Sequence, residues 1–208
     1  MDHEARWNAR YRDAGDEYLF GIEPNRFLAR RAYLFEDGHT ALSIADGEGR
    51  NSVWLAEQGL KVTAVEISPV AVEKARKLAA GRGVEVNFIV ADLLAPHWPP
   101  TAMENSFDWV VGIFIQFATA SERAHQFAAM KRATRAGGRI LLHGYTPRQL
   151  EYKTGGPSQI KQLYTQELLR AAFSDWTIEQ MAEYDDDIAE GSGHRGHSAL
   201  IGMVARKP

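Results

Sequence analysis

The stretch that most constrains the fold is residues 40–51, TALSIADGEGRN. An apolar run suited to a β-strand stops at a turn with Gly47 and Gly49, and a helical run, 51–58, follows at once. A strand, a glycine turn and a helix in this order point free backbone N–H groups at a ligand. The two glycines alone fit a plain strand-to-helix connection equally well. Residues further along the chain therefore have to decide between these interpretations.

Acidic residues end the next two strand-like runs. Glu66 follows the run 61–65, about 20 residues past the turn, which is the spacing of a carboxylate that binds a ribose diol. Asp92 follows the run 84–90. Because parallel strands end at the same edge of a sheet, we expect both acids to lie beside the glycine turn.

An acid at the end of a strand often caps the following helix instead of binding a ligand. After Glu66, however, Ser68 is suited to be the N-cap and Pro69 to be the first helical residue. We therefore expect the Glu66 carboxylate to be free and to bind a ligand.

Composition limits the classes of protein that remain. The chain has 208 residues, of which 45% are hydrophobic, and this suits a single α/β domain over residues 1–208. The absence of cysteine excludes disulfides, thiolate metal sites and a cysteine nucleophile. A net charge of −3 without a basic run argues against nucleic acid as the main partner. No run approaches the roughly 20 apolar residues of a membrane span, and no signal-peptide core is visible, so we expect a cytoplasmic protein.

Two helical patterns, 2–14 and 25–35, precede the first strand. Trp7 and Tyr11 lie four residues apart on one face of the first pattern. Small helices in this position can cover the carboxyl edge of the sheet, so residues 1–39 are expected to form a helical lid. The alternative is that the two aromatic residues only pack their helix onto the sheet.

The rest of the chain first alternates strands and helices, and this alternation ends in the last part of the sequence. Further strands are expected at 107–111 and 139–143, and further helices at 70–80, 118–133 and 165–173. The last two strand-like runs, 176–184 and 198–205, have only the charged connection 185–197 between them. They should pair antiparallel at one edge. The predicted fold is thus α/β, a doubly wound, Rossmann-like seven-stranded sheet, mostly parallel with a C-terminal antiparallel hairpin and helices on both faces.

From about residue 7 to 206, these motifs resemble class I S-adenosylmethionine-dependent methyltransferases. The resemblance is carried by DGEGRN, VTAVEIS with SPVAVEKA behind it, the acid in VAD, FDWVVG and the closing Gly-Gly turn. It is similar to the small-molecule branch that includes tellurite-resistance and thiopurine methyltransferases. The resemblance implies a cofactor-binding core at 40–145 and a substrate-side segment with the terminal hairpin at 146–208. It also implies S-adenosylmethionine as cofactor and a small-molecule acceptor such as a thiol, tellurite or selenite.

The resemblance implies roles for individual residues. Those expected to bind the cofactor are Ala45, Asp46, Gly47, Gly49, Glu66, Ile67, Asp92, Gly112 and Phe114. Among them, Glu66 would hold both ribose hydroxyls, Ile67 would pack on the adenine, and Asp92 would accept from its amino group. Those expected to meet the substrate are Gln116, Phe117 and Tyr145.

Two positions depart from the family's turn. Ser43 stands where the family has an acid, and Ala45 stands where the family has its first glycine. A methyl group is tolerable at Ala45 if its φ stays negative. Asp46 is then our candidate partner for the ammonium group of the cofactor.

No catalytic base is assigned from the sequence. His143 ends a strand and His97 lies in a proline-rich loop, and both are best explained without a catalytic role. His194 and His197, near Glu190, form too loose a pattern for a metal site. A soft or anionic nucleophile needs no base, whereas a neutral oxygen or nitrogen must lose a proton.

Two other functions remain open. A nicotinamide-dependent oxidoreductase would use the same turn and Glu66, but Ser52 stands where a full G-x-G-x-x-G needs its last small residue. The chain also lacks a tyrosine with a lysine four residues on, which short-chain reductases require. A non-catalytic module that binds the cofactor and regulates a partner is the second alternative.

Overall fold

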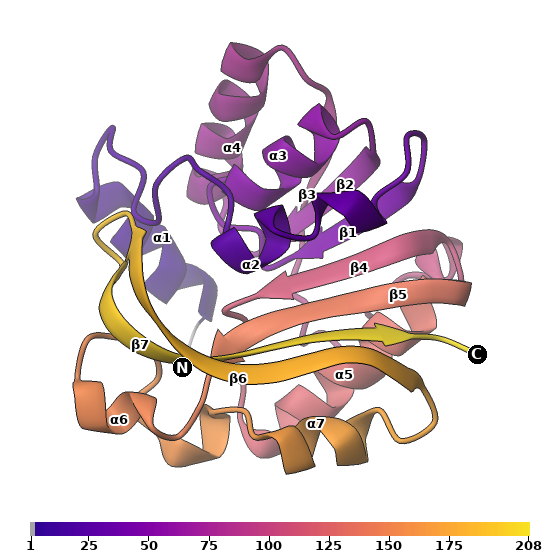
Figure 1. Ribbon diagram of the computed structural model, residues 1–208. Helices are drawn as coiled ribbons and strands as arrows, with labels where there is room; N and C mark the ends of the chain where they lie inside the picture. The colour runs from indigo at the N-terminus through magenta and orange to yellow at the C-terminus, as the bar shows by residue number, and fades with distance from the viewer. Residues whose placement is uncertain (1–2) are drawn as a thin grey trace.

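The computed structural model describes residues 3–208, in which one sheet has the strand order β3-β2-β1-β4-β5-β7-β6 (Figure 1). The strands are β1 Thr40–Ile44, β2 Lys61–Glu66, β3 Val86–Val90, β4 Phe107–Ile113, β5 Thr134–Tyr145, β6 Thr177–Glu190 and β7 His194–Arg206. Strands β1 to β5 run parallel, and β7 is antiparallel to both β5 and β6. The predicted seven-stranded fold with its reversed terminal hairpin is confirmed.

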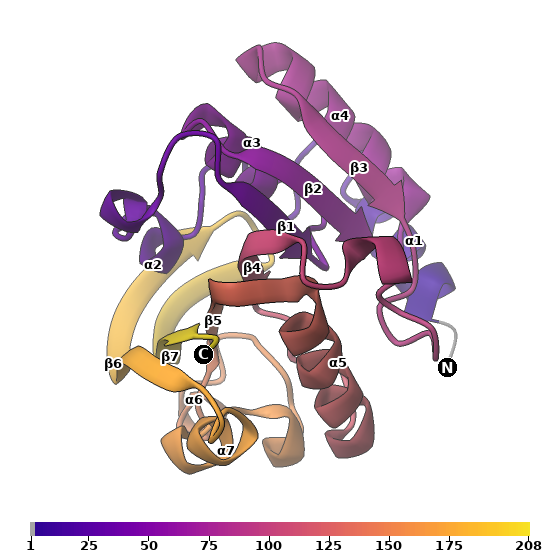
Figure 2. The ribbon, with the colours of Figure 1, turned by 90° about the vertical axis from the view of Figure 1, so that its right-hand side faces the viewer.

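Helices cover both faces of the sheet (Figures 1 and 2). They are α1 His3–Asp13, α2 Arg26–Ala29, α3 Arg50–Glu57, α4 Pro69–Arg82, α5 Ala120–Ala133, α6 Gln149–Tyr152 and α7 Gln166–Ala172. Short 3-10 turns are η1 Ala32–Leu34, η2 Thr101–Met103 and η3 Ile160–Gln162. Within the described residues, no helix combines the length and apolar character needed to cross a bilayer.

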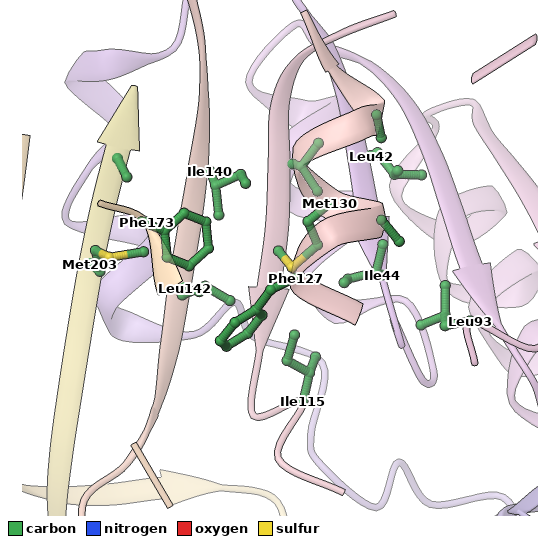
Figure 3. Close-up of a cluster of buried hydrophobic side chains, with 14 of the residues drawn as sticks. Leu42, Ile44, Leu93, Ile115, Phe127, Met130, Ile140, Leu142, Phe173 and Met203 are labelled. Carbon is green, nitrogen blue, oxygen red and sulfur yellow. The ribbon is translucent and has the colours of Figure 1, made fainter. Parts of the chain in front are cut away.

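Side-chain alternation along the central strands builds two cores. Leu42 and Ile44 of β1 pack on one face in a cluster with Phe127 and Met130 of α5 (Figure 3). The position before Leu42, Ala41, joins the cluster of α2 and α3 on the opposite face. Because successive strand residues point to opposite faces, one apolar strand supplies both layers.

Local capping signals start the helices where they were predicted. Ser68 is the N-cap of α4, its side chain accepts from the backbone N of Ala71, and Pro69 is the first helical residue. Thr165 caps α7 in the same way by accepting from the N of Leu168. Short-range hydrogen bonds of this kind depend on neighbouring residues alone, so they can be predicted from the sequence.

The single helix predicted over 25–35 is wrong. The structure has the four-residue helix α2 and then the separate turn η1. Asn25 caps α2, and the next two residues of the apolar pattern, Phe27 and Leu28, are buried. Tyr33, by contrast, is 72% exposed, so no continuous apolar stripe exists to hold a longer helix.

The terminal hairpin is much longer than predicted. Strand β6 continues to Glu190 and β7 begins at His194, so residues 185–187 belong to a strand and do not form the expected charged turn. Polar residues are tolerated there because β6 is the edge strand of the sheet. Strand β5 is also longer than 139–143, because Gly137 and Gly138 lie within it beside a register shift and do not end a loop.

Candidate functional site

A cavity of about 350 Å³ lies at the carboxyl ends of the parallel strands. It opens where the chain order reverses between β1 and β4, the place where sheets of this type bind ligands. The predicted site residues that line it are Ala45, Asp46, Gly47, Glu66, Ile67, Asp92, Phe114, Gln116, Phe117 and Tyr145. The structure thus brings most of the predicted cofactor and substrate residues to one place.

Two predicted cofactor residues, Gly49 and Gly112, do not line the cavity. Gly49 has φ +90° at the start of α3, and a Cβ there would lie 2.7 Å from the Cβ of Ala75 in α4. A Cβ on Gly112 would lie 2.6 Å from the Cδ1 of Ile115, on the core side of the sheet. Both glycines therefore allow close packing, and their predicted contact with the cofactor stays a prediction.

Ala45 has φ +47°, so the condition under which its methyl group is tolerated without strain is not met. The left-handed region costs an L-residue about 1–2 kcal/mol, because Cβ approaches the following carbonyl oxygen. Phe114, across the sheet at the end of β4, has φ +55°. Two strained residues thus face one cavity, which is typical of a functional site.

Asp46 is buried and held by two serines. Its Oδ1 accepts from Ser43 Oγ at 2.6 Å, and its Oδ2 accepts from Ser52 Oγ at 2.5 Å. Burial raises its pKa to about 6, while these hydrogen bonds act in the opposite direction. Ser43, which replaces the family's acid, therefore orients the acid that stands three residues later.

The Glu66 carboxylate is not free, contrary to our expectation. Its Oε1 accepts from the N of Ser68 at 2.9 Å, and its Oε2 accepts from the N of Gly47 at 3.0 Å. Burial raises its pKa to about 7. Each oxygen keeps a further lone pair, so Glu66 both fixes the glycine turn and faces the cavity.

The third acid, Asp92, is exposed at the rim of the same cavity. Its Oδ1 accepts from the N of Leu94 at 2.8 Å, which fixes the loop after β3. Gly47, Glu66 and Asp92 accordingly share one wall, as the parallel strands predicted.

Gln116 lines the same cavity and holds Tyr145 in place. Its Nε2 donates to the O of Tyr145 at 2.8 Å, and its Oε1 accepts from the N of Tyr145 at 2.6 Å. This two-way amide contact fixes Tyr145 at the end of β5. The Tyr145 hydroxyl is then 2.7 Å from Nδ1 of His194 in the hairpin.

His194 is a cavity residue that sequence reasoning missed, since it was considered only as a metal ligand. Its ring stacks on Phe20 with centroids 4.5 Å apart and on Phe114 with centroids 4.3 Å apart. Burial lowers its pKa to about 3, so the ring is neutral. Only the full length of the hairpin brings it here, and the misread connection 185–197 concealed that length.

Apart from His3 of α1, which also lines the cavity, the other histidines lie outside it. His143 contacts the hydroxyl of Tyr184 at 2.9 Å and stacks on Phe27, and burial lowers its pKa to about 3. His197 is 3.0 Å from Asp187 on the hairpin. His97 is exposed in its loop. Within residues 3–208, no three His, Cys, Asp or Glu side chains are placed to hold a metal ion.

Helix α1 contributes to the cavity and to packing. Trp7 and Tyr11 stack with centroids 5.8 Å apart, and both line the cavity. Tyr11 is 3% exposed, and a Cβ on Gly47 would lie 2.9 Å from its hydroxyl. Asn8, between them, accepts from Ser68 Oγ at 2.6 Å. Trp7 and Tyr11 therefore pack helix α1 in place and also line the cavity, so the packing interpretation and the lid interpretation are compatible.

Comparisons with known proteins agree with this geometry. Residues 41–138 match the family described as methyltransferase domain. A demethylmenaquinone methyltransferase of Thermus thermophilus is 30% identical over 108 residues, which are 51% of this chain and 47% of the relative. The chain thus spans about half the length of this relative.

Two solved structures share the fold. The first, studied for conversion of a disulfide bond into a thioacetal group during echinomycin biosynthesis, has a TM-score of 0.79 and 22% identity, covering 98% of this chain and 91% of that one. TehB from Haemophilus influenzae has a TM-score of 0.70 and 18% identity, covering 88% of this chain and 62% of that one.

The cavity suits the adenosyl amino acid that such domains bind. Carboxylates lie next to the turn and at the end of β2, where an ammonium group and a ribose diol require acceptors. The matched segment contains the turn, both acids and the strands that carry them. Residues 41–138 of this chain therefore match the methyltransferase domain family, and the cavity that they help to line suits S-adenosylmethionine as cofactor.

Proposed function

We propose that this protein transfers a methyl group from S-adenosylmethionine to a small-molecule acceptor held in the same cavity. The observation that carries this proposal is the opening of Gly47, Glu66 and Asp92 onto a space also lined by Phe114 and Tyr145. The bound sulfonium supplies an activated methyl group. The protein then has to align the acceptor and exclude water, which is worth roughly 7–11 kcal/mol of the barrier.

The proposed cofactor contacts follow the polar groups of the cavity. Glu66 would accept from the ribose hydroxyls through its remaining lone pairs, and Asp46 would face the ammonium group. Ile67 would pack on the adenine, with Asp92 at the rim accepting from its amino group. Helix α1 would cover the bound cofactor as a lid, with Tyr11 beside the glycine turn.

The acceptor is inferred from the two ionisable side chains among the aromatic rings of the cavity, His194 and Tyr145. The pKa of His194 is lowered to about 3, and burial raises the pKa of Tyr145 well above its usual value. Neither group can remove a proton efficiently near neutral pH. This favours an acceptor that is soft or readily ionised, such as a thiol, tellurite or selenite.

Aromatic side chains support a second type of acceptor. Phe20, His194, Phe114 and Tyr145 stack in succession along the cavity, with neighbouring ring centroids 4.3–4.6 Å apart. A flat ring can pack against the side of such a run of aromatic rings. The relative named demethylmenaquinone methyltransferase makes a quinone-type acceptor the alternative to be tested.

The decisive experiment combines calorimetry with turnover. We expect S-adenosylhomocysteine to bind and NADH not to bind, with one or more of the thiol, tellurite, selenite or hydroquinone acceptors consuming S-adenosylmethionine. Binding of NADH alone would make the protein an oxidoreductase. Binding of S-adenosylhomocysteine with no methylated product would favour the regulatory module. The expectations of a cytoplasmic location and of no nucleic-acid partner stay predictions.

A further inference from the structure

Helix α1 brings two arginines to the cavity. Arg6 and Arg10 lie four residues apart, so they share one face of the helix, and both line the cavity. In the described chain, no carboxylate forms an ion pair with either of them. Arg50, which also lines the cavity, differs because its guanidinium lies 2.6 Å from Glu190. The two α1 arginines thus present guanidinium groups without an ion-pair partner at the cavity wall.

Arg10 is held in place by aromatic rings. Its guanidinium lies 4.7 Å from the centroid of Trp7 and 5.7 Å from that of Phe20. Phe20 in turn stacks on His194. The charge of Arg10 contributes to the lowered pKa of His194, after burial and Arg50. Arg10 therefore lies at one end of the aromatic run, and its charge affects the pKa of His194 in the hairpin.

We propose that Arg6 and Arg10 form an anion subsite for the methyl acceptor. The acceptor would have a flat apolar body against the aromatic rings and a carboxylate or similar oxyanion against α1. A guanidinium binds a carboxylate through two parallel hydrogen bonds, and stacking on Trp7 reduces the freedom it loses on binding. This inference rests on the proposed function and specifies the charge of its acceptor.

The cofactor offers the same chemistry, because its amino-acid end also carries a carboxylate. The two sources can be separated by measuring binding to the protein already loaded with S-adenosylhomocysteine. Benzoate and benzamide are suitable probes, since they share shape and differ in charge. Arg6→Gln and Arg10→Gln are the test variants. Arg12→Gln is the matched control, because Arg12 is exposed on the same helix and outside the cavity lining.

We expect the loaded wild type to bind benzoate roughly tenfold more tightly than benzamide, as charge-assisted hydrogen bonds require. Arg10→Gln should remove this preference, Arg6→Gln should reduce it, and Arg12→Gln should retain it. Added salt should weaken benzoate binding only. Circular dichroism and thermal unfolding check that the variants are folded, and each probe is measured by calorimetry.

Three results would overturn the inference. Equal or undetectable binding of the two probes to the loaded wild type is the first. A benzoate preference that survives in both test variants is the second. The third is a loss of S-adenosylhomocysteine affinity in Arg10→Gln but not in Arg12→Gln, because the pair would then hold the cofactor. Failure of the wild type to bind S-adenosylhomocysteine at all would instead count against the proposed function.

Discussion

The guanidinium of Arg50 and the carboxylate of Glu190 lie 2.6 Å apart, although the residues are 140 positions apart in the chain. Their side chains are only 7% and 8% exposed. The other carboxylate oxygen of Glu190 accepts from Asn25 Nδ2 at 2.9 Å, and the N of Asn25 donates to Asn51 Oδ1 at 2.9 Å. One buried network therefore joins the start of α3, the segment after α1 and the tip of the hairpin.

Breaking this pair should be costly. Glu190→Ala leaves the Arg50 charge buried and unpaired, so the free energy of unfolding should fall by about 3–5 kcal/mol. Urea unfolding measures the change. The matched control is Glu57→Gln, which removes the half-exposed ion pair with Arg82 at 3.5 Å and should cost less than about 1 kcal/mol. Equal effects of the two substitutions would show that the buried Arg50–Glu190 pair contributes no more to stability than an ion pair at the surface.

Ala45→Gly should stabilise the protein. At φ +47° a glycine avoids the steric cost that the alanine bears, and the expected gain is about 1 kcal/mol, reduced by the greater freedom of glycine in the unfolded chain. Thermal unfolding tests this. Ala41→Gly, in the neighbouring strand β1, should have the opposite effect because it removes a buried methyl group. A lower melting temperature for Ala45→Gly would disprove the strain.

Glu66→Ala should weaken binding of S-adenosylhomocysteine. Loss of the proposed ribose hydrogen bonds should cost on the order of 2 kcal/mol of binding free energy. Glu85→Ala is the control, since Glu85 is exposed and outside the cavity lining. Calorimetry of the three proteins compares the affinities, and an unchanged affinity in Glu66→Ala would refute the ribose assignment.

The same carboxylate should make stability depend on pH. Burial raises the pKa of Glu66 from 4.5 to about 7, so the folded protein holds this proton more tightly than the unfolded chain. Its contribution is therefore full below pH 4.5 and is lost as the pH rises to about 7, by about 3 kcal/mol. Glu66→Gln should remove this part of the decline from urea unfolding curves and leave the part due to Asp46, whose pKa is also raised, whereas Glu85→Gln should retain both parts. A variant with the wild-type pH profile would disprove the shift.

The His194→Phe variant tests whether His194 only lines the cavity or also acts as a catalytic base. Phenylalanine preserves the stacking on Phe20 and Phe114 but loses the contact with Tyr145. We expect kcat to change by less than about tenfold and its pH profile to keep its shape, since a general base contributes roughly 100-fold or more. A larger fall in kcat, or a lost inflection in the profile, would assign the proton transfer to His194.

Short-range signals predicted much of the fold and one side of the cavity. The order of strand, glycine turn and helix, the caps Ser68 and Thr165, and the acids after β2 and β3 all depend on neighbouring residues. The hairpin was misjudged because the polar residues of an edge strand resemble those of a loop. His194 and the Arg50–Glu190 pair depend on contacts across most of the chain, which no local pattern reports.

The turn between β6 and β7 limits how the part of the cavity proposed to hold the methyl acceptor can change its shape. A Cβ on Gly191 would lie 2.4 Å from both the N of Gly21 and the O of Leu19, so main chain meets main chain at this seam. The N of Gly193 also donates to the O of Leu19 at 2.8 Å. A boundary built from backbone cannot be widened by exchanging side chains. In the proposed site, a change of acceptor choice at this seam must therefore come from the neighbouring rings, with Phe20 as the first position to vary.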